Sequence, residues 1–380
     1  MKKNLVAVTL ALVLTLCNVS VLVDNSSSSE EIMVIVDMDA TCDDWQSILY
    51  LLKHPAVTVI GIGVSCGVSY VDTGVTNTLA VLEFLEIDDI PVAAGKETPL
   101  VVDHAFPTPW REASYNFYGL DLPTTTLQPS SLNASELIIS LTESSERNVT
   151  LIALGPLTNI AIALETDPSI KSKIDEILLM GGAIDVPGNV GLESDIPNYV
   201  AEWNIWVDPH AADIVFRSGL PIRMVSLDAT NQVPQTQAFL DRLELVMSTT
   251  EAYLLYDMTS VGLYFWDQLT VVTLTNSEVV TWEEHCIEIV VDLNNHEGMT
   301  NSTDVGCSNA LVAVSANSSL FEDLFIGYIN DGILTTTTAT TTTTVTGDTT
   351  TTAFDPMFLV TVGSGIVIVI AIVLIALKRR

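Results

Sequence analysis

The feature that most constrains the fold is a regular alternation of short apolar runs with amphipathic segments between residues 31 and 335. The runs have strand length, and the segments between them carry apolar residues at helical spacing. The runs lie at 31–39, 57–67, 89–95, 148–155, 176–182 and 220–228. A strand–helix–strand rhythm predicts an α/β fold with an open, mostly parallel (mixed) sheet and helices on both faces. Because no Pro/Ser-rich linker interrupts the pattern, we expect one domain at residues 31–334.

The two ends of the chain predict a membrane protein. Residues 1–23 begin with lysines, continue with an apolar run and end in small and polar residues, as a signal peptide does. Residues 357–377 form an uncharged apolar stretch long enough for a transmembrane helix, and three cations follow at 378–380. A removed glycolipid-anchor signal is the alternative, but such signals end in their apolar run. We expect a single-pass type I protein of the cell surface or another secretory-pathway membrane, with an extracellular or lumenal domain and a cytosolic basic end.

A Thr-rich segment at 335–356 has little to bury, so it predicts an extended stalk before the transmembrane helix. Beyond the predicted signal peptide, five sequons for N-glycosylation agree with a glycoprotein. They begin at Asn25, Asn133, Asn148, Asn301 and Asn317.

The cysteines predict disulfides better than they predict a metal site. Beyond the signal peptide the chain has Cys42, Cys66, Cys286 and Cys307, which allow three pairings in an oxidising compartment. No C-x-x-C motif occurs, so a structural zinc site is disfavoured. We expect a late disulfide between Cys286 and Cys307, and a second one between Cys42 and Cys66 would tie two early loops together.

The charge of the chain restricts its partners. The formal net charge is −33 at pH 7. Such a surface excludes nucleic acid and anionic membrane as partners and favours cations.

Four aspartates follow the first predicted strand, in the stretch VIVDMDATCDD at 34–44. They are Asp37, Asp39, Asp43 and Asp44. Carboxylates that converge on one crevice need a counter-charge, and a hard divalent cation such as calcium or magnesium supplies it. Helix capping would explain Asp43 and Asp44 alone. Asp37 and Asp39, at the end of an apolar strand, would remain without a reason.

Two motif interpretations of this stretch can be compared from the residues. An EF-hand loop starting at Asp37 would need Gly and Glu where Cys42 and Ile48 stand, so it fails. An apolar strand followed by DMDAT also resembles haloacid-dehalogenase-type phosphatases, with Asp37 as nucleophile and Asp39 as acid/base. Such enzymes need a lysine at a strand end, whereas Lys171 and Lys173 lie in a helix-like segment.

The whole stretch DMDATCDDW resembles the signature of the inosine-uridine-preferring, calcium-dependent nucleoside hydrolases. Further matches follow in the family's order: GIGVSCGVS, DDIPVAAG, LIALGPLTNIAIAL, EILLMGGAIDVPGNV, AEWNIWVDPHAADIVFRSGLPIRMVSLDATNQV and YFWDQL. They cover roughly residues 33–300, and their joint occurrence is far more specific than any one of them. The resemblance implies a Rossmann-like sheet and one calcium ion at the bottom of the pocket.

The resemblance also implies a set of metal ligands and a catalytic base. Asp39 and Asp44 would bind calcium from the first loop, Thr158 would supply a main-chain carbonyl, and Asp267 would close the site. Asp39 would also accept the proton of the attacking water. Asp43 would hold a ribose hydroxyl, and Asp37 would stand behind the ligands.

The remaining matches imply how the nucleoside is held. Asn189, Glu202 and Asn204 match the family's ribose clamp, although the segment between Asn189 and Glu202 is longer than usual. Trp203 stands at a usually aromatic position and would form pocket wall or core.

The chain also departs from the family at three positions. Thr41 replaces the signature Gly, and Val68 replaces an Asn that binds ribose. Trp266 replaces a His that protonates the leaving base. Trp266 could stack on the base or fill core, and His104, in a loop of the right region, could supply the missing acid.

The sequence thus predicts calcium-dependent hydrolysis of the N-glycosidic bond of ribonucleosides, as in purine nucleosidases, at the outer face of a membrane. The partners would be a small nucleoside and, by family analogy, further copies in a homodimer or homotetramer. The alternatives are the phosphatase and a non-catalytic calcium-binding surface receptor.

Overall fold

The computed structural model describes residues 31–292, 295–303, 307–331, 361–362 and 365–366. Its centre is a nine-stranded sheet of order β3-β2-β1-β4-β5-β6-β9-β7-β8. The strands are β1 (Ile32–Met38), β2 (Val57–Val64), β3 (Val92–Ala94), β4 (Val149–Ala153), β5 (Ile174–Met180), β6 (Ile222–Val225), β7 (Val280–Ile289), β8 (Thr300–Thr303) and β9 (Ala310–Ala316). All neighbours are parallel except β7, which runs antiparallel to β8 and β9. The predicted mostly parallel, mixed sheet is confirmed.

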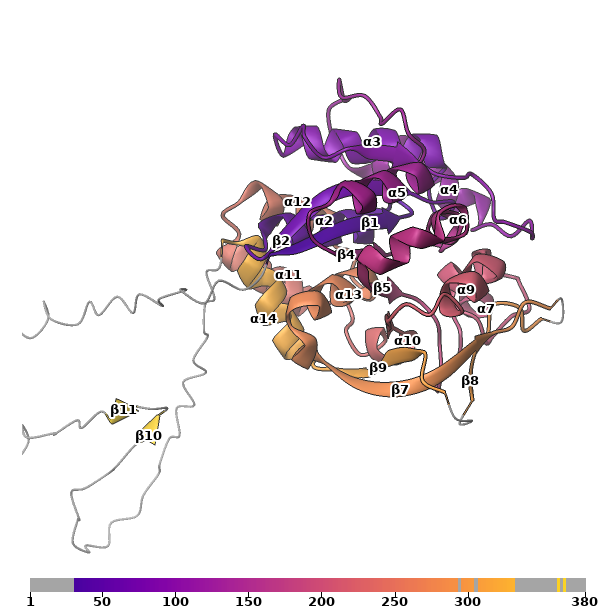
Figure 1. The fold of residues 1–380 in the computed structure, drawn as a ribbon. Helices are drawn as coiled ribbons and strands as arrows, with labels where there is room; N and C mark the ends of the chain where they lie inside the picture. The colour runs from indigo at the N-terminus through magenta and orange to yellow at the C-terminus, as the bar shows by residue number, and fades with distance from the viewer. Residues whose placement is uncertain (1–30, 293–294, 304–306, 332–360, 363–364, 367–380) are drawn as a thin grey trace, which may run out of the picture. The chain divides into compact units, whose positions relative to one another are not determined.

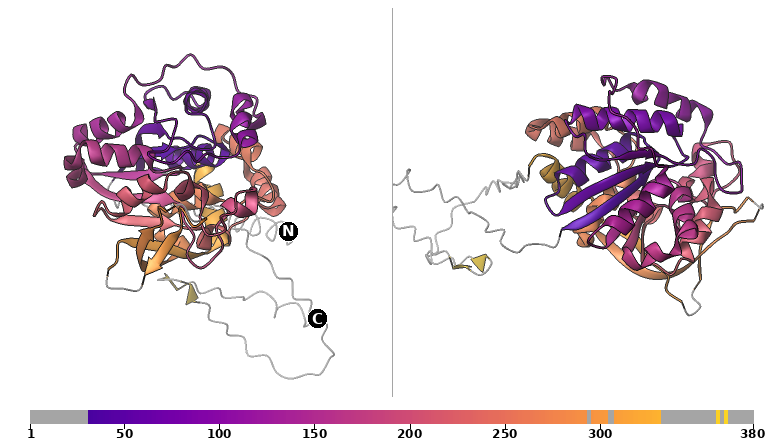
Figure 2. Two further views of the ribbon diagram at one scale, coloured as in Figure 1. Left: turned by 90° about the vertical axis from the view of Figure 1, so that its right-hand side faces the viewer. Right: turned by 45° about the horizontal axis from the view of Figure 1, so that its top comes forward.

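Helices cover both faces of this sheet (Figures 1 and 2). The α-helices are α2 (Cys42–Lys53), α3 (Val71–Phe84), α4 (Thr108–Ala113), α5 (Ala134–Ser144), α6 (Thr158–Thr166), α7 (Val190–Glu193), α8 (Trp203–Val207), α9 (Pro209–Phe216), α10 (Leu227–Thr230), α11 (Gln237–Val246), α12 (Thr250–Met258), α13 (Trp266–Thr275) and α14 (Ser318–Ile329). Three 3-10 helices are η1 (Ser114–Gly119), η2 (Pro168–Lys173) and η3 (Ser277–Val279). Helix α2 contacts α12, α13 and α14, whereas α6 contacts α5 and α9. The two groups form separate layers.

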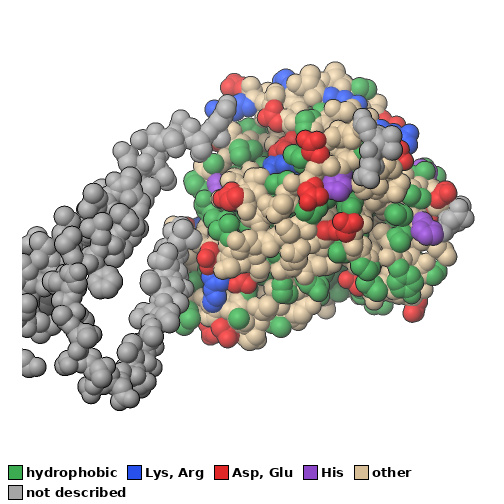
Figure 3. Space-filling model, turned by 90° about the horizontal axis from the view of Figure 1, so that it is seen from below, with side chains coloured by type: hydrophobic (Ala, Val, Ile, Leu, Met, Phe, Trp, Pro, Cys, Tyr) green, Lys and Arg blue, Asp and Glu red, His purple; other side chains and the backbone are tan. Residues whose placement is uncertain are grey.

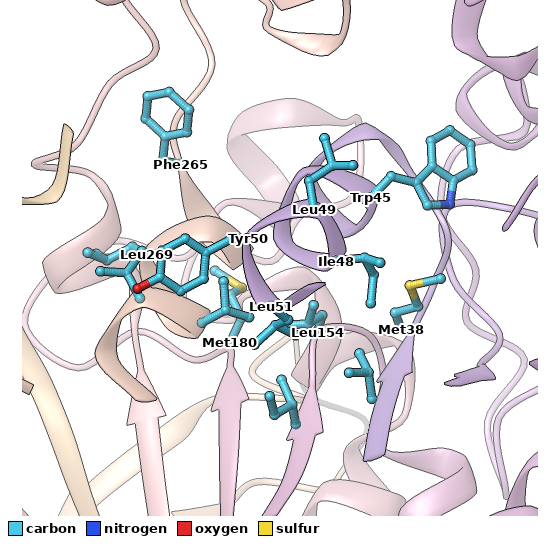
Figure 4. Close-up of a cluster of buried hydrophobic side chains, with 14 of the residues drawn as sticks. Met38, Trp45, Ile48, Leu49, Tyr50, Leu51, Leu154, Met180, Phe265 and Leu269 are labelled. Atoms are coloured by element: carbon cyan, nitrogen blue, oxygen red, sulfur yellow. The ribbon is translucent and has the colours of Figure 1, made fainter. Parts of the chain in front are cut away.

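The apolar run of β1 explains this layering. Its side chains alternate between the two faces, so Val34 and Val36 belong to one buried cluster and Ile35 to the other. The first cluster includes Trp45, Tyr50 and Phe265, all fully buried (Figure 4). A strand buried on both faces reads as a continuous apolar run, which is how the sequence reveals it.

The strand order fixes where a ligand can bind. The chain builds β1, β2 and β3 toward one edge and then returns to place β4 on the other side of β1. In such sheets the crevice lies beyond the carboxyl ends of the strands at this reversal. The loop after β1, which carries the four aspartates, begins there.

Of the two disulfides that the sequence led us to expect, the structure contains one. Cys286 in β7 forms a disulfide with Cys307, as predicted. Cys42 and Cys66 are free thiols, so the disulfide expected between them is absent. The Sγ of Cys66 instead lies 3.4 Å from the hydroxyl of Thr158.

The predicted transmembrane helix at 357–377 is wrong for the part of the chain that the structure describes. Inside that range, Thr361–Val362 (β10) and Gly365–Ile366 (β11) form an antiparallel pair. Among all described residues, no helix has the length and apolar character to cross a bilayer. The membrane anchor and the single-pass placement at a cell-surface or secretory-pathway membrane rested on that helix and fall with it. The predicted signal peptide, stalk and basic end lie outside the described residues.

Surface charge follows the composition. Acidic side chains are spread over the face shown in Figure 3, and its described atoms form no continuous basic patch. This face offers no continuous basic surface to a polyanion.

Candidate active site

The acidic loop is shaped by a helix cap and one left-handed residue. Thr41 is the N-cap of α2, and its backbone N–H donates to Oδ2 of Asp44 at 2.8 Å. Thr41 has an extended backbone (φ −111°), whereas Ala40 is left-handed (φ 62°). Thr41 therefore does not carry the strain expected from its replacement of Gly, because the residue before it adopts the unusual conformation. This turn directs Asp39 and the first turn of α2 to the same side.

Asp39 and Asp44 are buried neighbours. Asp39 is 4% exposed and Asp44 is fully buried, and the charge of each acts on the other. Burial raises the pKa of Asp39 to about 7, partly opposed by the N–H of Val68, which donates to Oδ2 at 2.9 Å. Burial and the charges of Asp39 and Asp43 hold the pKa of Asp44 well above its usual range. Two carboxyls in this setting need a counter-charge to ionise together.

Asp267, at the start of α13, completes a set of oxygen ligands. Carboxylate oxygens of Asp43, Asp44 and Asp267 all lie within 4.8 Å of one another. Oδ1 of Asp44 is buried and has no hydrogen-bond partner among the described residues. A buried carboxylate oxygen without a donor, surrounded by other carboxylates, fits a hard divalent cation. Asp39 lies beside this trio and outside it.

Asp37 stands behind these groups. It is buried and does not line the cavity described below, and its Oδ1 accepts a hydrogen bond from Nδ2 of Asn159 at 2.9 Å. Burial raises its pKa to about 7, against the effect of that bond. The supporting role that the resemblance implies for Asp37 stays a prediction.

Thr158 lies away from the cavity, in the first turn of α6. Its hydroxyl donates to Oδ2 of Asp208 at 2.7 Å. Leu154, directly after β4, lines the cavity instead. The main-chain carbonyl predicted for Thr158 stays a prediction, and Leu154 offers a strand-end carbonyl that the sequence reasoning missed. The signal for Leu154 was its position at the carboxyl end of a buried strand.

A cavity of about 620 Å³ opens above the carboxylates. Its polar lining includes Asp39, Asp43, Asp267, Asn189, Glu202, Asn204, Gln46 and Gln235. Its apolar lining includes Phe106, Trp110, Trp203, Trp266, Tyr118, Met180, Met258 and Leu263. The volume suits a small organic ligand. A carboxylate-rich part and an aromatic part suit a molecule with a sugar at one end and a planar ring at the other.

The predicted ribose clamp meets at one edge of this cavity. Glu202 is buried and accepts three backbone N–H groups, from Asn204 (2.9 Å), Gly182 (3.1 Å) and Ile205 (3.2 Å). Burial still raises the pKa of Glu202 to about 7. Asn204 donates to the carbonyl of Leu154 at 2.9 Å.

Asn189 reaches this edge despite the long segment that separates it from Glu202. That segment folds back on itself, and the N–H of Gly188 donates to the carbonyl of Tyr199 at 2.9 Å. The return brings Oδ1 of Asn189 within 3.2 Å of the N–H of Trp203, from which it accepts a hydrogen bond.

Of the two residues predicted to contact the base, Trp266 and His104, only Trp266 lines the cavity. Trp266 lines the cavity, as its proposed stacking role requires. His104 does not line it, because its ring stacks on Trp206 at 4.0 Å and its Nε2 lies 3.2 Å from Glu297. His104 therefore does not replace the histidine missing at Trp266. Glu193, which sequence reasoning also missed, does line the cavity.

The phosphatase alternative requires a basic side chain near the aspartates, and the described lining of this cavity provides none. Among the described residues that line it there is no Lys or Arg. Lys171 donates to the carbonyl of Ser218 and Lys173 to that of Glu143, so both are engaged elsewhere. A phosphate ester would meet carboxylates without a basic partner.

Comparisons with known proteins agree with this geometry. The family model of the inosine-uridine preferring nucleoside hydrolases matches residues 34–323. A pyrimidine-specific ribonucleoside hydrolase, RihA of Shewanella sp. (strain ANA-3), is 37% identical over 216 residues, which are 56% of this chain and 64% of that protein. RihB of Escherichia coli O157:H7, also named pyrimidine-specific, is 31% identical over 322 residues, which are 79% of this chain and 99% of the relative.

Solved structures give the same result. A purine-preferring ribonucleoside hydrolase from Gardnerella vaginalis superposes with a TM-score of 0.69 at 28% identity. The plant nucleoside hydrolase PpNRh1 also gives 0.69, at 27% identity. Both matches cover 79% of this chain and 99% of the other.

Proposed function

Because the chain belongs to the inosine-uridine preferring nucleoside hydrolase family, we propose that it hydrolyses the N-glycosidic bond of ribonucleosides to free base and ribose. The observation that carries the proposal is the convergence of Asp39, Asp43, Asp44 and Asp267 at a cavity of nucleoside size. The relatives named as ribonucleoside hydrolases support the same reaction class. The Shewanella relative is matched over 64% of its length, so its activity enters here as support for a proposal.

We propose calcium as the cofactor. Asp43, Asp44 and Asp267 would hold it, with Asp39 beside them. A main-chain carbonyl, that of Leu154 or that of Thr158, would supply a further oxygen ligand. An all-oxygen set with several carboxylates suits calcium, which accepts many oxygen ligands in flexible geometry. When bound, such a cation neutralises the clustered carboxylates and makes water more acidic.

Asp39 is the proposed general base. Val68 occupies Oδ2 of its carboxylate, which leaves Oδ1 to take a proton from the attacking water. Burial among other carboxyls raises its pKa to about 7, and a base in this range is well matched to neutral pH. The new C1′–O bond forms as the bond between C1′ and the base nitrogen breaks.

The clamp residues orient the sugar, and the aromatic part of the cavity holds the base. The side chains of Glu202 and Asn204 are held by the hydrogen bonds to backbone groups given above, so they can bind the sugar without first changing conformation. Trp266 and Trp203 offer flat apolar surface for the ring of the base. Asp43, which lines the same cavity, would bind the cation or, in its place, a ribose hydroxyl.

A panel of common ribonucleosides tests the proposal. Purified protein with calcium should release ribose from at least one of inosine, uridine, adenosine, guanosine and cytidine, and a chelator should abolish the release. Asp39→Asn should lower kcat by roughly 10²- to 10⁴-fold, as expected for loss of a general base. Asp257→Asn removes an equal charge from an exposed site on α12 and should leave the rate unchanged. Calcium binding without ribose release from any nucleoside would overturn the proposal and favour a binding protein.

A further inference from the structure

One carboxyl in the cavity has no part in the mechanism above. Titratable side chains that line the cavity are Asp39, Cys42, Asp43, Tyr118, Glu193, Glu202 and Asp267. Three of these belong to the acidic site. A departing base carries the electron pair of the broken bond, so a group that gives it a proton lowers the barrier. Since Trp266 has no proton of suitable acidity, an acid in this cavity has to be another of its lining side chains.

Most of the other lining groups cannot donate a proton to the base. Both oxygens of Glu202 accept backbone N–H groups. Burial raises the pKa of the Cys42 thiol to about 12. The Ser69 hydroxyl donates its single proton to the carbonyl of Ala40 at 2.6 Å, so the Tyr118 hydroxyl, 2.8 Å from Ser69, must donate to Ser69.

Glu193 is free of these restrictions. Its Oε2 accepts a hydrogen bond from Nε1 of Trp203 at 2.9 Å, and its Oε1 receives none from the described residues. The residue is exposed, so a proton can be replaced from solvent. Partial burial of the carboxyl raises its pKa, which favours the protonated form.

The position of Glu193 ties it to the aromatic part of the cavity. Trp203, its hydrogen-bond partner, stacks on Phe106 at 4.8 Å and meets Trp110 edge-on at 5.5 Å. These three rings line the cavity and form the apolar surface suited to a planar base. The N–H of Glu193 donates to the carbonyl of Asn189 at 3.0 Å, so the segment that carries the clamp also fixes Glu193.

From this arrangement we propose that Glu193 is the catalytic acid that protonates the departing base, an inference that rests on the hydrolase function proposed above. The Glu193 O–H gives its proton to a ring nitrogen or oxygen of the base while the C1′–N bond breaks and its electron pair moves to the base. Water forms the new bond to C1′ and gives its proton to Asp39. Solvent then reprotonates Glu193 and takes the proton of Asp39, so the net reaction consumes one water.

Leaving-group dependence tests this assignment. Uridine, 5-fluorouridine and 4-nitrophenyl β-D-ribofuranoside carry leaving groups of increasing acidity. Glu193→Gln keeps an acceptor for Trp203 and loses the proton. In this variant kcat/KM on uridine should fall by roughly 10²- to 10⁴-fold, and on the nitrophenyl riboside by less than about tenfold, because that phenolate leaves without a proton. Asp195→Asn, in the same segment and outside the cavity lining, is the charge-matched control and should match wild type on all three.

The ratio of rates on two substrates decides the outcome even if the variant folds poorly, because the folded fraction cancels. An unchanged ratio in Glu193→Gln would overturn the role of Glu193, whether measured with all three substrates or with any two that wild type accepts. If wild type cleaves none of these three substrates and none of the five ribonucleosides of the panel above, the hydrolase function fails, which is a result distinct from the failure of Glu193 alone.

Discussion

The backbone N–H of Val68 donates to Oδ2 of Asp39 over 2.9 Å, so the loop after β2 fixes the carboxylate at the end of β1. The resemblance to the family marks Val68 as the loss of a side-chain hydrogen bond to ribose. The main chain at the same residue nevertheless supports the proposed base. Its neighbour Gly67 lies so close that a Cβ there would overlap the side chain of Asp39. Support for Asp39 therefore depends on backbone geometry.

Gly67→Ala should impair catalysis through Asp39. The added methyl displaces the carboxylate, and a displacement of about 1 Å in a catalytic group can cost roughly 10²-fold in rate. Initial rates on the best nucleoside, with stability from thermal unfolding, measure the effect. Gly61→Ala is the matched control. A Cβ at Gly61, which lies in β2, would overlap the side chain of Leu141, a residue that does not line the cavity. This variant should lower the melting temperature without a comparable loss of kcat, and an equal loss of kcat in both variants would contradict the prediction.

Calcium should bind more tightly as the pH rises. Burial raises the pKa of Asp39 to about 7 and holds those of Asp44 and Asp267 above their usual range, so protons compete with the cation at low pH. Affinity should increase from pH 5 to pH 8, with protons released on binding. Calorimetry in buffers of different ionisation enthalpy measures both.

Removal of one carboxylate tests the same site. Asp267→Asn should weaken calcium by at least about tenfold, because the site loses a charged oxygen ligand. Asp257→Asn, on the exposed side of α12, should bind as wild type does. Affinity that is independent of pH, or unaffected by Asp267→Asn, would place the cation elsewhere.

The parts of the site that could be predicted are those that lie together in the sequence. Asp37, Asp39, Asp43 and Asp44 follow one apolar strand, so elementary charge repulsion already points to a cation. Asp267 lies far along the chain, and only the family resemblance connects it with the first loop. The parallel sheet could be predicted for a similar reason, because the strand–helix alternation that indicates it, such as β1 followed by α2, lies in continuous stretches of the sequence.

The parts that could not be predicted depend on contacts between distant segments. Glu193 carries no motif, and its place in the cavity results from a segment that folds back through Gly188 and Tyr199. Strand β7 has many exposed positions, so it lacks the continuous apolar run of β1. The left-handed residue at Ala40 instead of Thr41 is a backbone choice that residue types leave open. The homodimer or homotetramer expected from the family stays a prediction.

His54 should make the protein sensitive to acid. It is buried at the end of α2, its Nδ1 accepts the N–H of Ala56 at 3.2 Å, and burial lowers its pKa to about 4 from the ordinary 6.5. Between these values the unfolded chain binds a proton that the folded protein does not. The free energy of unfolding should therefore fall as the pH drops from about 6.5 to about 4, by on the order of 2 to 3 kcal/mol from this residue.

Urea unfolding at several pH values measures this slope. His54→Gln should show a shallower decrease over the same range, because glutamine takes no proton. The comparison is between slopes, since loss of the ring contact with Tyr328 lowers stability at every pH. Parallel curves for the two proteins would contradict the assignment to His54.

The side chain of Thr158 should contribute to stability and not to the metal site. Its hydroxyl donates to the buried Asp208 at 2.7 Å, and Asp208 in turn accepts the N–H of Ala211 at 3.0 Å at the start of α9. Thr158→Val keeps the shape of the side chain and removes one donor from a buried carboxylate, which should cost about 1 to 3 kcal/mol. Thr166→Val, at the exposed end of α6, should cost less than about 0.5 kcal/mol. Urea unfolding and calcium titration separate the two roles. A loss of calcium affinity in Thr158→Val without a loss of stability would place the hydroxyl of Thr158 in the metal site and overturn this prediction.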